Sequence, residues 1–181
     1  MDFLLERASV ADLDQVMGLE DEGFPPGIRE SRAVFERRIR AFPEGFLLAR
    51  PAGQAAMGYL CAEIWKDWDL QNESRFDLGH DIGTWLDPRG HTLYVASMTV
   101  AASYRGGTGR ALFRRSLERL ADDFPQLTSA VLIVNEHWTA ARRIYGDDGF
   151  VETARLPAFF RPEGGPLGDA LVMTRRFPAE A

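Results

Sequence analysis

Apolar residues recur at three- and four-residue spacing over residues 112–124, and mostly polar side chains fill the positions between them. The apolar positions are Leu112, Phe113, Leu117, Leu120, Ala121 and Phe124. This spacing predicts an amphipathic helix that packs on a sheet. The run 130–134 that follows is apolar at every position, which is typical of a central strand covered on both faces. Because another strand-like run, 93–100, precedes the helix, the pattern predicts two parallel strands joined by a crossover helix.

Shorter patterns on both sides of this unit predict further strands and helices. Strands are expected at 3–7, 45–50, 55–65, 151–160 and 169–176. Helices are expected from Ser9, as an N-cap, to about Gly23, from Ser31 onward, and over a short segment that ends in Tyr145. The turn 51–53 joins its two strands as a hairpin, and the last two strands form an antiparallel pair. We therefore expect an α/β fold with a mixed sheet and helices on both faces.

Composition and charge narrow the classes of function. The chain has 181 residues, 45% of them hydrophobic, which suits a single domain over 1–181 with a substantial core. No apolar run approaches the roughly 20 residues of a membrane span, so no membrane partner is expected. A formal net charge of -6 argues against nucleic acid as a partner, because sequence-independent binding depends on cationic surface. The single cysteine, Cys61, excludes an internal disulfide and favours a cytoplasmic location, and within an apolar strand it is expected to be buried filler.

A glycine-rich turn separates the first parallel strand from the amphipathic helix. It reads Tyr-Arg-Gly-Gly-Thr-Gly-Arg over 104–110. The N-terminus of a helix offers free backbone N–H groups and the positive end of the helix dipole, which together can bind an anion such as a pyrophosphate. Arg105 and Arg110 bracket the glycines and can add cationic side chains. A turn that needs glycine only for its conformation is the alternative interpretation.

Four features occur in a fixed order along this part of the chain. They are the strand end Met98-Thr99-Val100, the turn Arg105-Gly106-Gly107-Thr108-Gly109-Arg110, Asn135 just past the next strand, and Tyr145 four residues before Gly149-Phe150. Together they resemble the GNAT superfamily of acetyl-CoA-dependent N-acyltransferases, and the resemblance covers nearly the whole chain. It implies a GNAT-type mixed, mostly antiparallel central sheet with a parallel strand pair at a cofactor cleft.

The glycine turn departs from the usual family pattern, Arg/Gln-x-x-Gly-x-Gly. Counted from Arg105, the turn is one residue short. Counted back from Gly109, Gly107 and Gly109 are in register and Tyr104 takes the Arg/Gln position. The sequence leaves both registers open.

The resemblance also implies roles for these residues, with acetyl-CoA as co-substrate and no metal. The strand end 98–100 would hydrogen-bond the pantetheine arm, the turn 105–110 would hold the pyrophosphate, and Asn135 would contact the cofactor. Tyr145 would lie near the sulfur. The implied reaction is acetyl transfer to a primary amine, of a small molecule or a peptide, by direct attack in a ternary complex.

Acetyl transfer to an amine requires a base, a donor for the oxyanion and an acid for the departing thiolate. The resemblance gives the acid's role to Tyr145, and the alternative is a tyrosine that only packs in the core. For the base, Glu63 is the first choice, because it shares a sheet face with Cys61 and could line the cleft. A solvated strand carboxylate is the equal alternative for Glu63.

The histidines do not change this assignment. His80, His91 and His137 have no partner at a diagnostic spacing, and with one cysteine they predict no metal site.

The connection 66–91 between two predicted strands is unusually long and combines aromatic with acidic residues. Such loops in compact domains are often functional, and this one would suit a cationic or aromatic amine. A solvated or dimer-forming loop is the plain alternative, which leaves a homodimer open.

The segment 24–47 also resembles the acceptor region of polyamine and arylalkylamine acetyltransferases, but their His-x-His reads Tyr94-Val95-Ala96 here. Because the histidine pair is missing, this resemblance indicates small amines as acceptors and nothing more specific.

Two hypotheses from different classes follow from the sequence. The first is an acetyl-CoA-dependent N-acetyltransferase. The second is a non-catalytic acyl-CoA-binding or interaction domain of the same fold, which the short glycine turn and the absent histidine pair keep open.

Overall fold

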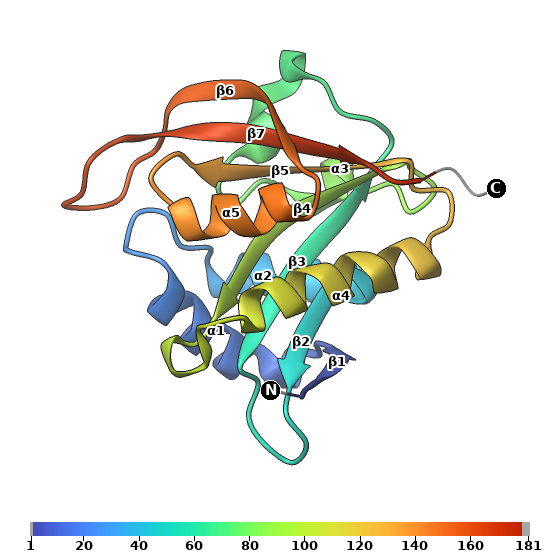
Figure 1. Cartoon of the computed structure of the whole chain (residues 1–181), viewed down its shortest axis with the longest axis vertical. Coiled ribbons are helices and arrows are strands. Elements are labelled where there is room, and N and C mark those ends of the chain that lie inside the picture. Colours follow the sequence, from blue (N-terminus) through green and yellow to red (C-terminus); the bar gives the residue numbers. More distant parts are fainter. Residues whose placement is uncertain (1, 179–181) are drawn as a thin grey trace.

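A seven-stranded sheet in the order β1-β2-β3-β4-β5-β7-β6 runs through the computed structural model, which describes residues 2–178 (Figure 1). The strands are β1 (Leu4–Arg7), β2 (Phe46–Arg50), β3 (Gly58–Trp65), β4 (Thr92–Val100), β5 (Ser129–Asn135), β6 (Val151–Phe160) and β7 (Gly168–Arg176). The α-helices are α1 (Leu13–Gly23), α2 (Arg32–Ala41), α3 (Ile82–Trp85), α4 (Thr108–Asp123) and α5 (Thr139–Asp147). Four 3₁₀ turns complete the described elements: η1 (Val10–Asp12), η2 (Pro43–Gly45), η3 (Leu70–Phe76) and η4 (Ala102–Tyr104).

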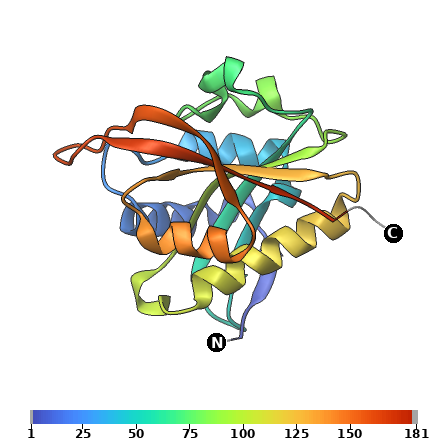
Figure 2. The same cartoon turned by 45° about the horizontal axis from the view of Figure 1, so that its top comes forward.

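The strand pairing is mostly antiparallel, as predicted, and β4 with β5 forms the parallel pair. Helices cover both faces: α4 and α5 lie in front of the sheet in Figure 1, and α2 lies behind it. Figure 2, turned by 45°, shows α2 and α4 on opposite sides of the central strands. The predicted apolar stripe of α4 explains its position, because Leu112, Phe113 and Leu120 are fully buried in the core cluster on that face.

Local signals set where the N-terminal helices begin. The Ser31 hydroxyl accepts a hydrogen bond from the Val34 N–H at 3.3 Å, as an N-cap does. The segment after Ser9 starts as the 3₁₀ turn η1, and the Asp12 carboxylate accepts from the Ser9 N–H at 2.8 Å. None of the helices formed within residues 2–178 has the length and apolar character that crossing a bilayer requires.

The composition of the connection 66–91 predicts a loop, but the structure shows regular elements in it. It contains η3 and α3, and Leu86 forms an isolated antiparallel bridge with Trp65. Phe76 and Ile82 are buried, at 2% and 3% exposure, so apolar contacts fold this connection back onto the sheet.

The parallel pair β4–β5 is short, and this shapes the centre of the molecule. Pairing extends only from Thr92 with Ser129 to Val95 with Leu132. Beyond this point β5 continues along β7, whereas β4 continues along β3 to Val100. A register shift opposite Cys61 and Ala62 leaves Ala96 as an extra residue on β4. Figure 1 shows the two strands diverging, so residues 96–100 of β4 have no strand partner on the β5 side.

Candidate active site

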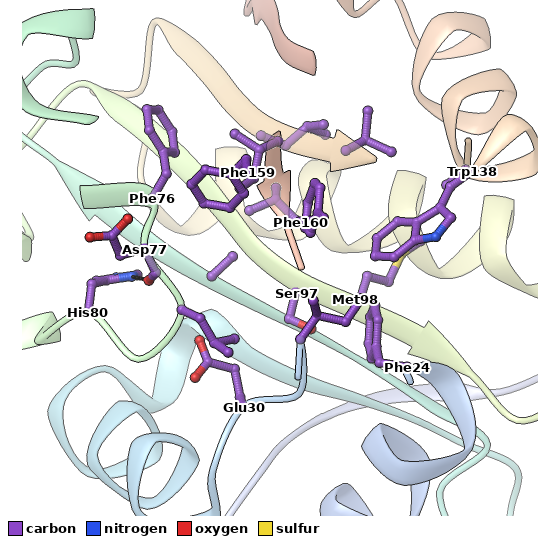
Figure 3. Close-up of a pocket in the computed structure, with 18 of the residues that line it drawn as sticks. Phe24, Glu30, Phe76, Asp77, His80, Ser97, Met98, Trp138, Phe159 and Phe160 are labelled. Carbon is purple, nitrogen blue, oxygen red and sulfur yellow. Dashed lines mark hydrogen bonds between the residues drawn. The ribbon is translucent and has the colours of Figure 1, made fainter. Parts of the chain in front are cut away.

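A cavity of about 670 Å³ opens where β4 and β5 diverge. Its first wall is formed by residues 94–98 of β4, 132–134 of β5, and three side chains of the α5 region, Trp138, Ala141 and Tyr145. The cavity extends to a second wall from the α1–α2 region, the connection 66–91 and the end of β6 (Figure 3). We call the gap between the strands, with the turn 105–110 beside it, the glycine end. The region around Glu20, Glu30, Arg38, Glu63 and His80 is the charged end.

The unpaired edge of β4 is the main feature of the glycine end. Met98 lines the cavity with its side chain. The Thr99 side chain points the other way, against Gly23 of α1, so close that a Cβ on Gly23 would overlap its hydroxyl. Val100 is 9% exposed and belongs to the core cluster under α4. Thr99 and Val100 can therefore offer a ligand only their backbone groups.

The glycine turn presents backbone amides at the start of α4. Gly106 and Gly107 have φ values of +105° and +122°, which residues with a side chain rarely adopt. A Cβ on either would meet no atom within 4 Å, so the space beside them is open. The Ala111 N–H bonds the Gly107 carbonyl at 3.1 Å, and the amides of the first helical turn before it have no intrahelical partner. The turn thus has the geometry of an anion site, with Gly106 and Gly107 as its conformationally special residues.

Gly109 has a different task from the other two glycines. It lies inside the first turn of α4, and a Cβ there would be 3.4 Å from Ile144 Cδ1 of α5. A side chain there would touch α5, whereas the space beside Gly106 and Gly107 is open. Of the two flanking arginines, Arg110 forms an ion pair with Asp147 of α5, whereas the exposed Arg105 has no side-chain partner within residues 2–178. Arg105 is therefore the cation available for an anion at this turn.

Asn135 directly follows the β5 residues that line the cavity, but it does not line the cavity itself. It is 4% exposed, and its side-chain oxygen accepts from the His137 N–H at 2.9 Å. Gly168 packs so tightly on it that a Cβ there would be 2.7 Å from the Asn135 amide atoms. The side chain therefore fixes the turn that leads into α5, and its predicted contact with a cofactor stays a prediction.

Tyr145 lies on the first wall of the cavity, with Trp138 and Ala141. Its ring packs on Phe113, with centroids 4.8 Å apart, and the residue is 8% exposed. Its hydroxyl has no hydrogen-bond partner within the described part of the chain. Burial raises the pKa of Tyr145 to about 12, so the phenol is a proton donor at neutral pH.

The charged end is a buried network of ionisable side chains. Arg38 of α2, only 2% exposed, lies 3.0 Å from Glu30 and 3.3 Å from Glu63. His80 Nε2 is 2.8 Å from the second of these carboxylates, and His80 Nδ1 is 3.4 Å from Arg38 Nη2. Three atoms, Glu30 Oε2, Arg38 Nε and Arg38 Nη1, are buried with no hydrogen-bond partner among the described residues. Buried groups of this kind are costly, which marks this end as a place where a ligand can supply the missing partner.

Glu63 belongs to this network but does not line the cavity. It has no exposed surface, and its oxygens accept from the Trp65 indole at 3.0 Å and bind His80. Burial by itself would raise the pKa of Glu63, but the hydrogen bond and charge of His80 and the charge of Arg38 outweigh burial and hold the pKa below its ordinary range. Glu63 therefore faces the cavity only through His80, and it is not the solvated carboxylate that the sequence left open.

A second chain of hydrogen bonds runs from α1 to β4. The Tyr59 hydroxyl donates to the Glu20 carboxylate and lies 2.9 Å from Ser97 Oγ. The other oxygen of Glu20 accepts from the Glu30 N–H at 2.8 Å. Glu20 and Ser97 line the cavity, and burial raises the pKa of Glu20. Tyr59 joins them from a fully buried position.

The end of β6 and the α1–α2 loop line one side of the cavity. Phe159 and Phe160 of β6 line it, and the Phe160 ring packs on Trp138 with centroids 5.2 Å apart (Figure 3). The Glu163 N–H, in the loop after β6, bonds the Pro26 carbonyl in the α1–α2 loop at 2.8 Å. Together the loops and the connection 66–91 give this part of the cavity an aromatic lining, with Asp77 exposed at its rim.

The remaining sequence candidates lie elsewhere. Cys61 is 1% exposed, as expected of buried filler, and burial raises its thiol pKa to about 12. His91 and His137 do not line the cavity. Among residues 2–178, no group of three or more His, Cys, Asp or Glu side chains is arranged to hold a metal ion.

Sequence reasoning missed most of the charged end, although a signal for part of it exists. On α2, the buried positions Val34, Phe35 and Ile39 share their face with Arg38. On α1, Glu20 falls in the same way on the face of the buried apolar residues. A charged residue at a position of the apolar period is the sequence sign of a buried ion. No comparable signal marks Glu30 or Ser97.

Comparison with known proteins identifies the fold. No protein-family model and no curated protein matches the chain by sequence. Solved structures do match: the NatC complex bound to Gag peptide and CoA has a TM-score of 0.74 at 14% identity, over 98% of this chain and 100% of that one. The GNAT-like decarboxylase GphF in complex with isobutyryl-CoA has a TM-score of 0.75 at 19% identity, over 96% and 98%. The ribosomal-protein-S18-alanine N-acetyltransferase from Escherichia coli has a TM-score of 0.70 at 16% identity, over 97% and 94%.

These likenesses extend over nearly the whole chain, at identities below 20%. They establish that the chain has the GNAT fold, as the resemblance of its motifs implied. Because the same fold is used by different reactions, the chemistry has to be argued from the site itself.

Proposed function

We propose that this protein is an acetyl-CoA-dependent N-acetyltransferase that acetylates a primary amine, of a small molecule or a peptide, by direct attack in a ternary complex. The observation that carries the proposal is one continuous cavity. It joins the unpaired edge of β4 to an acidic and aromatic chamber, the Tyr145 hydroxyl on its wall has no partner, and the glycine turn follows the end of β4 in the chain.

The glycine end fits the parts of coenzyme A. The free edge of β4 over 96–100 offers backbone groups that an extended pantetheine arm can pair with, as an added strand would. The amides of Gly106, Gly107, Thr108 and Gly109, with Arg105, would bind the pyrophosphate, and the positive φ of the first two and the start of α4 at Thr108 support this. Arg110 contributes through its ion pair with Asp147, which ties α4 to α5. Asn135 supports the cofactor site through the turn that it holds.

The residues between the two ends fit the chemistry of acyl transfer. Acetyl-CoA supplies a thioester, whose acyl carbon the amine attacks. The extra residue Ala96 interrupts the pairing of β4 with β3, and the backbone N–H groups of the strand end 98–100 that follows would donate to the oxyanion that develops on the thioester carbonyl. Tyr145 would donate to the departing thiolate, because burial raises its pKa to about 12 and the phenol is therefore protonated at neutral pH.

The charged end favours an amine as the acceptor. Three buried carboxylates, Glu20, Glu30 and Glu63, lie near the buried Arg38 and the His80 ring. Their excess of negative charge, with Asp77 at the rim, attracts an ammonium group, and the surrounding aromatic rings add cation–π contact. Two of the structural neighbours support amines of peptides as a substrate class, one seen with a Gag peptide and the other named for alanine in a ribosomal protein.

Within this function Glu63 is a positioning residue. Its carboxylate holds the His80 ring at the cavity wall, so it influences the acceptor through His80. The buried thiol of Cys61 suits a reducing compartment, which supports the cytoplasmic assignment.

The test combines cofactor binding with turnover. Calorimetry with coenzyme A should show binding, and thiol release from acetyl-CoA should depend on an amine from a panel of small amines and peptides with free N-termini. Binding without thiol release on any amine would instead favour a non-catalytic acyl-CoA-binding domain. Thiol release that needs no amine would contradict amine acetylation and indicate another acyl-CoA reaction on this fold.

A further inference from the structure

The hydrogen-bonded chain Glu20–Tyr59–Ser97 connects the cavity to a buried carboxylate by a route that the sequence did not indicate. Ser97 lies on β4 next to Ala96 and Met98, at the point where the edge of the strand becomes free (Figure 3). Its hydroxyl contacts Tyr59 at 2.9 Å, and Tyr59 contacts Glu20. The three groups form an unbroken path from the cavity wall through the sheet to α1.

The charge of Glu20 fixes the direction of each hydrogen bond. An ionised carboxylate can only accept, so the Tyr59 hydroxyl donates its hydrogen to Glu20. The phenol oxygen then has only acceptor capacity left, so Ser97 donates to Tyr59. The remaining lone pairs of Ser97 Oγ are available to the cavity. Ser97 therefore presents an acceptor to an ammonium N–H of a ligand in the cavity.

We infer that Ser97, Tyr59 and Glu20 form a relay that removes the proton from the acceptor amine. The inference rests on the proposed N-acetyltransferase function. The ammonium N–H gives its proton to Ser97 Oγ, the Ser97 hydrogen moves to the Tyr59 oxygen, and the Tyr59 hydrogen moves to Glu20. Three O–H or N–H bonds break and three O–H bonds form, which leaves a neutral amine and a protonated Glu20. Because Glu20 also lines the cavity, its proton can return to water when product leaves.

The surroundings of Glu20 suit a proton acceptor. Burial raises its pKa, and the neighbouring charge of Glu30 acts in the same direction. The hydrogen bonds from Tyr59 and from the Glu30 N–H, with the charge of Arg38 on α2, limit the rise. Tyr59 itself is fully buried and its pKa is raised, so it passes a proton on without becoming an anion.

Glu63 does not offer the same route. Its pKa is held down, it does not line the cavity, and its hydrogen bonds lead to Trp65 and His80. The structure thus separates two buried carboxylates by role, with Glu20 able to take up a proton and Glu63 fixed as an anion.

The experiment compares acceptors that need deprotonation with acceptors that do not. Glu20→Gln, Tyr59→Phe and Ser97→Ala are assayed with an alkylamine, whose pKa is about 10.4, at pH 7 and near pH 10. Each variant should lose about 10²-fold in kcat/KM at pH 7 and less than about threefold near pH 10, where much of the amine is already neutral. An arylamine, which is neutral at pH 7, should show the small loss at both pH values.

The relay also predicts how the substitutions combine. Since breaking any link stops the whole path, the double variant Tyr59→Phe with Glu20→Gln should be no slower than either single variant by more than about twofold. Coenzyme A affinity and the melting temperature are measured in parallel. Glu118→Gln, an exposed change on α4, is the charge-matched control and should leave all readouts unchanged.

Three results would overturn the relay. Equal losses at both pH values and with both amines would assign the three residues to structure. Additive losses in the double variant would mean that they act separately. A pH-dependent loss in His80→Gln but not in Glu20→Gln would place the base at His80. Absence of amine-dependent thiol release in the wild-type protein would instead refute the proposed function, and the relay with it.

Discussion

The glycine end of the cavity is made of backbone, whereas the charged end is made of buried side chains. At the glycine end, a free strand edge and the amides of one helical turn come from a single stretch of chain, 96–110. At the charged end, Glu20, Glu30, Arg38, Glu63 and His80 come from α1, α2, β3 and the connections between elements. The difference suits two kinds of ligand, since a backbone surface can bind an invariant cofactor while side chains can be adapted to one acceptor.

The two ends also differ in what holds them together. The glycine end rests on sheet pairing and on the packing of α4, and few polar groups there are buried. The charged end holds ionised groups away from water, where each charge depends on its partner. Removing one partner should therefore affect folding at the charged end and ligand binding at the glycine end.

The largest expected effect comes from Arg38→Leu. It leaves Glu30 and Glu63 buried without their cation, which should lower the free energy of unfolding by about 3–5 kcal/mol. The melting temperature should fall by roughly 10 °C, since each kcal/mol corresponds to about 2–4 °C in a protein of this size. Arg40→Leu on the same helix is the control, because that arginine is 63% exposed and its pair with Glu36 should contribute only about 0.3–0.5 kcal/mol. Equal melting temperatures for both variants would mean that the charged end is not a stabilising network.

Tyr145→Phe tests the proposed acid on the first wall of the cavity. We expect kcat to fall about 10²-fold, because the departing thiolate loses its acid, while coenzyme A affinity changes little. Because the pKa of Tyr145 is raised to about 12, the phenol stays protonated below that pH, so its titration should cause no fall in wild-type activity between pH 7 and 10. Stopped-flow turnover and calorimetric titration measure the two quantities separately. Losses of similar size in turnover and affinity would show that the hydroxyl positions the cofactor.

The smallest expected effect comes from Gly107→Asp at the glycine end. The new carboxylate occupies open space beside the amides and repels a pyrophosphate, so the Kd for coenzyme A should rise roughly 10-fold. Gly107→Ala separates the strain of a positive φ from the added charge. Gly53→Asp is the matched control, since Gly53 also has a positive φ and open space around it but lies in the β2–β3 turn. An unchanged Kd in Gly107→Asp would remove this turn from the cofactor site.

Much of the glycine end could be predicted from sequence because its determinants are close together in the chain. The apolar period of α4, the uniform run of β5 and the glycines between β4 and α4 each follow from local rules. Tyr145 was also placed correctly on a short helix, although that helix continues to Asp147. The register of the turn could not be predicted, because only the backbone angles show which glycines adopt positive φ.

The charged end was largely hidden because its contacts join residues far apart in the chain. His80 lies in a polar stretch of the connection 66–91, and nothing near it in sequence indicates that it meets Glu63. Glu63 itself was expected to reach the cavity, and the structure instead puts His80 in front of it. The extra residue in β4, which exposes the strand edge from Ala96 rather than from Met98, likewise depends on the pairing with β3.

The sequence by itself determined the seven strands, the longer helices, the parallel unit around α4 and the place of the glycine turn, because hydrophobic period and turn chemistry act over short distances. Only the tertiary structure decided which charged side chains are buried together, because burial and pairing of ions depend on elements that meet after folding. For this protein, the glycine end is therefore specified by residues close together in the chain, and the charged end forms only once α1, α2, β3 and the connection 66–91 have packed against one another.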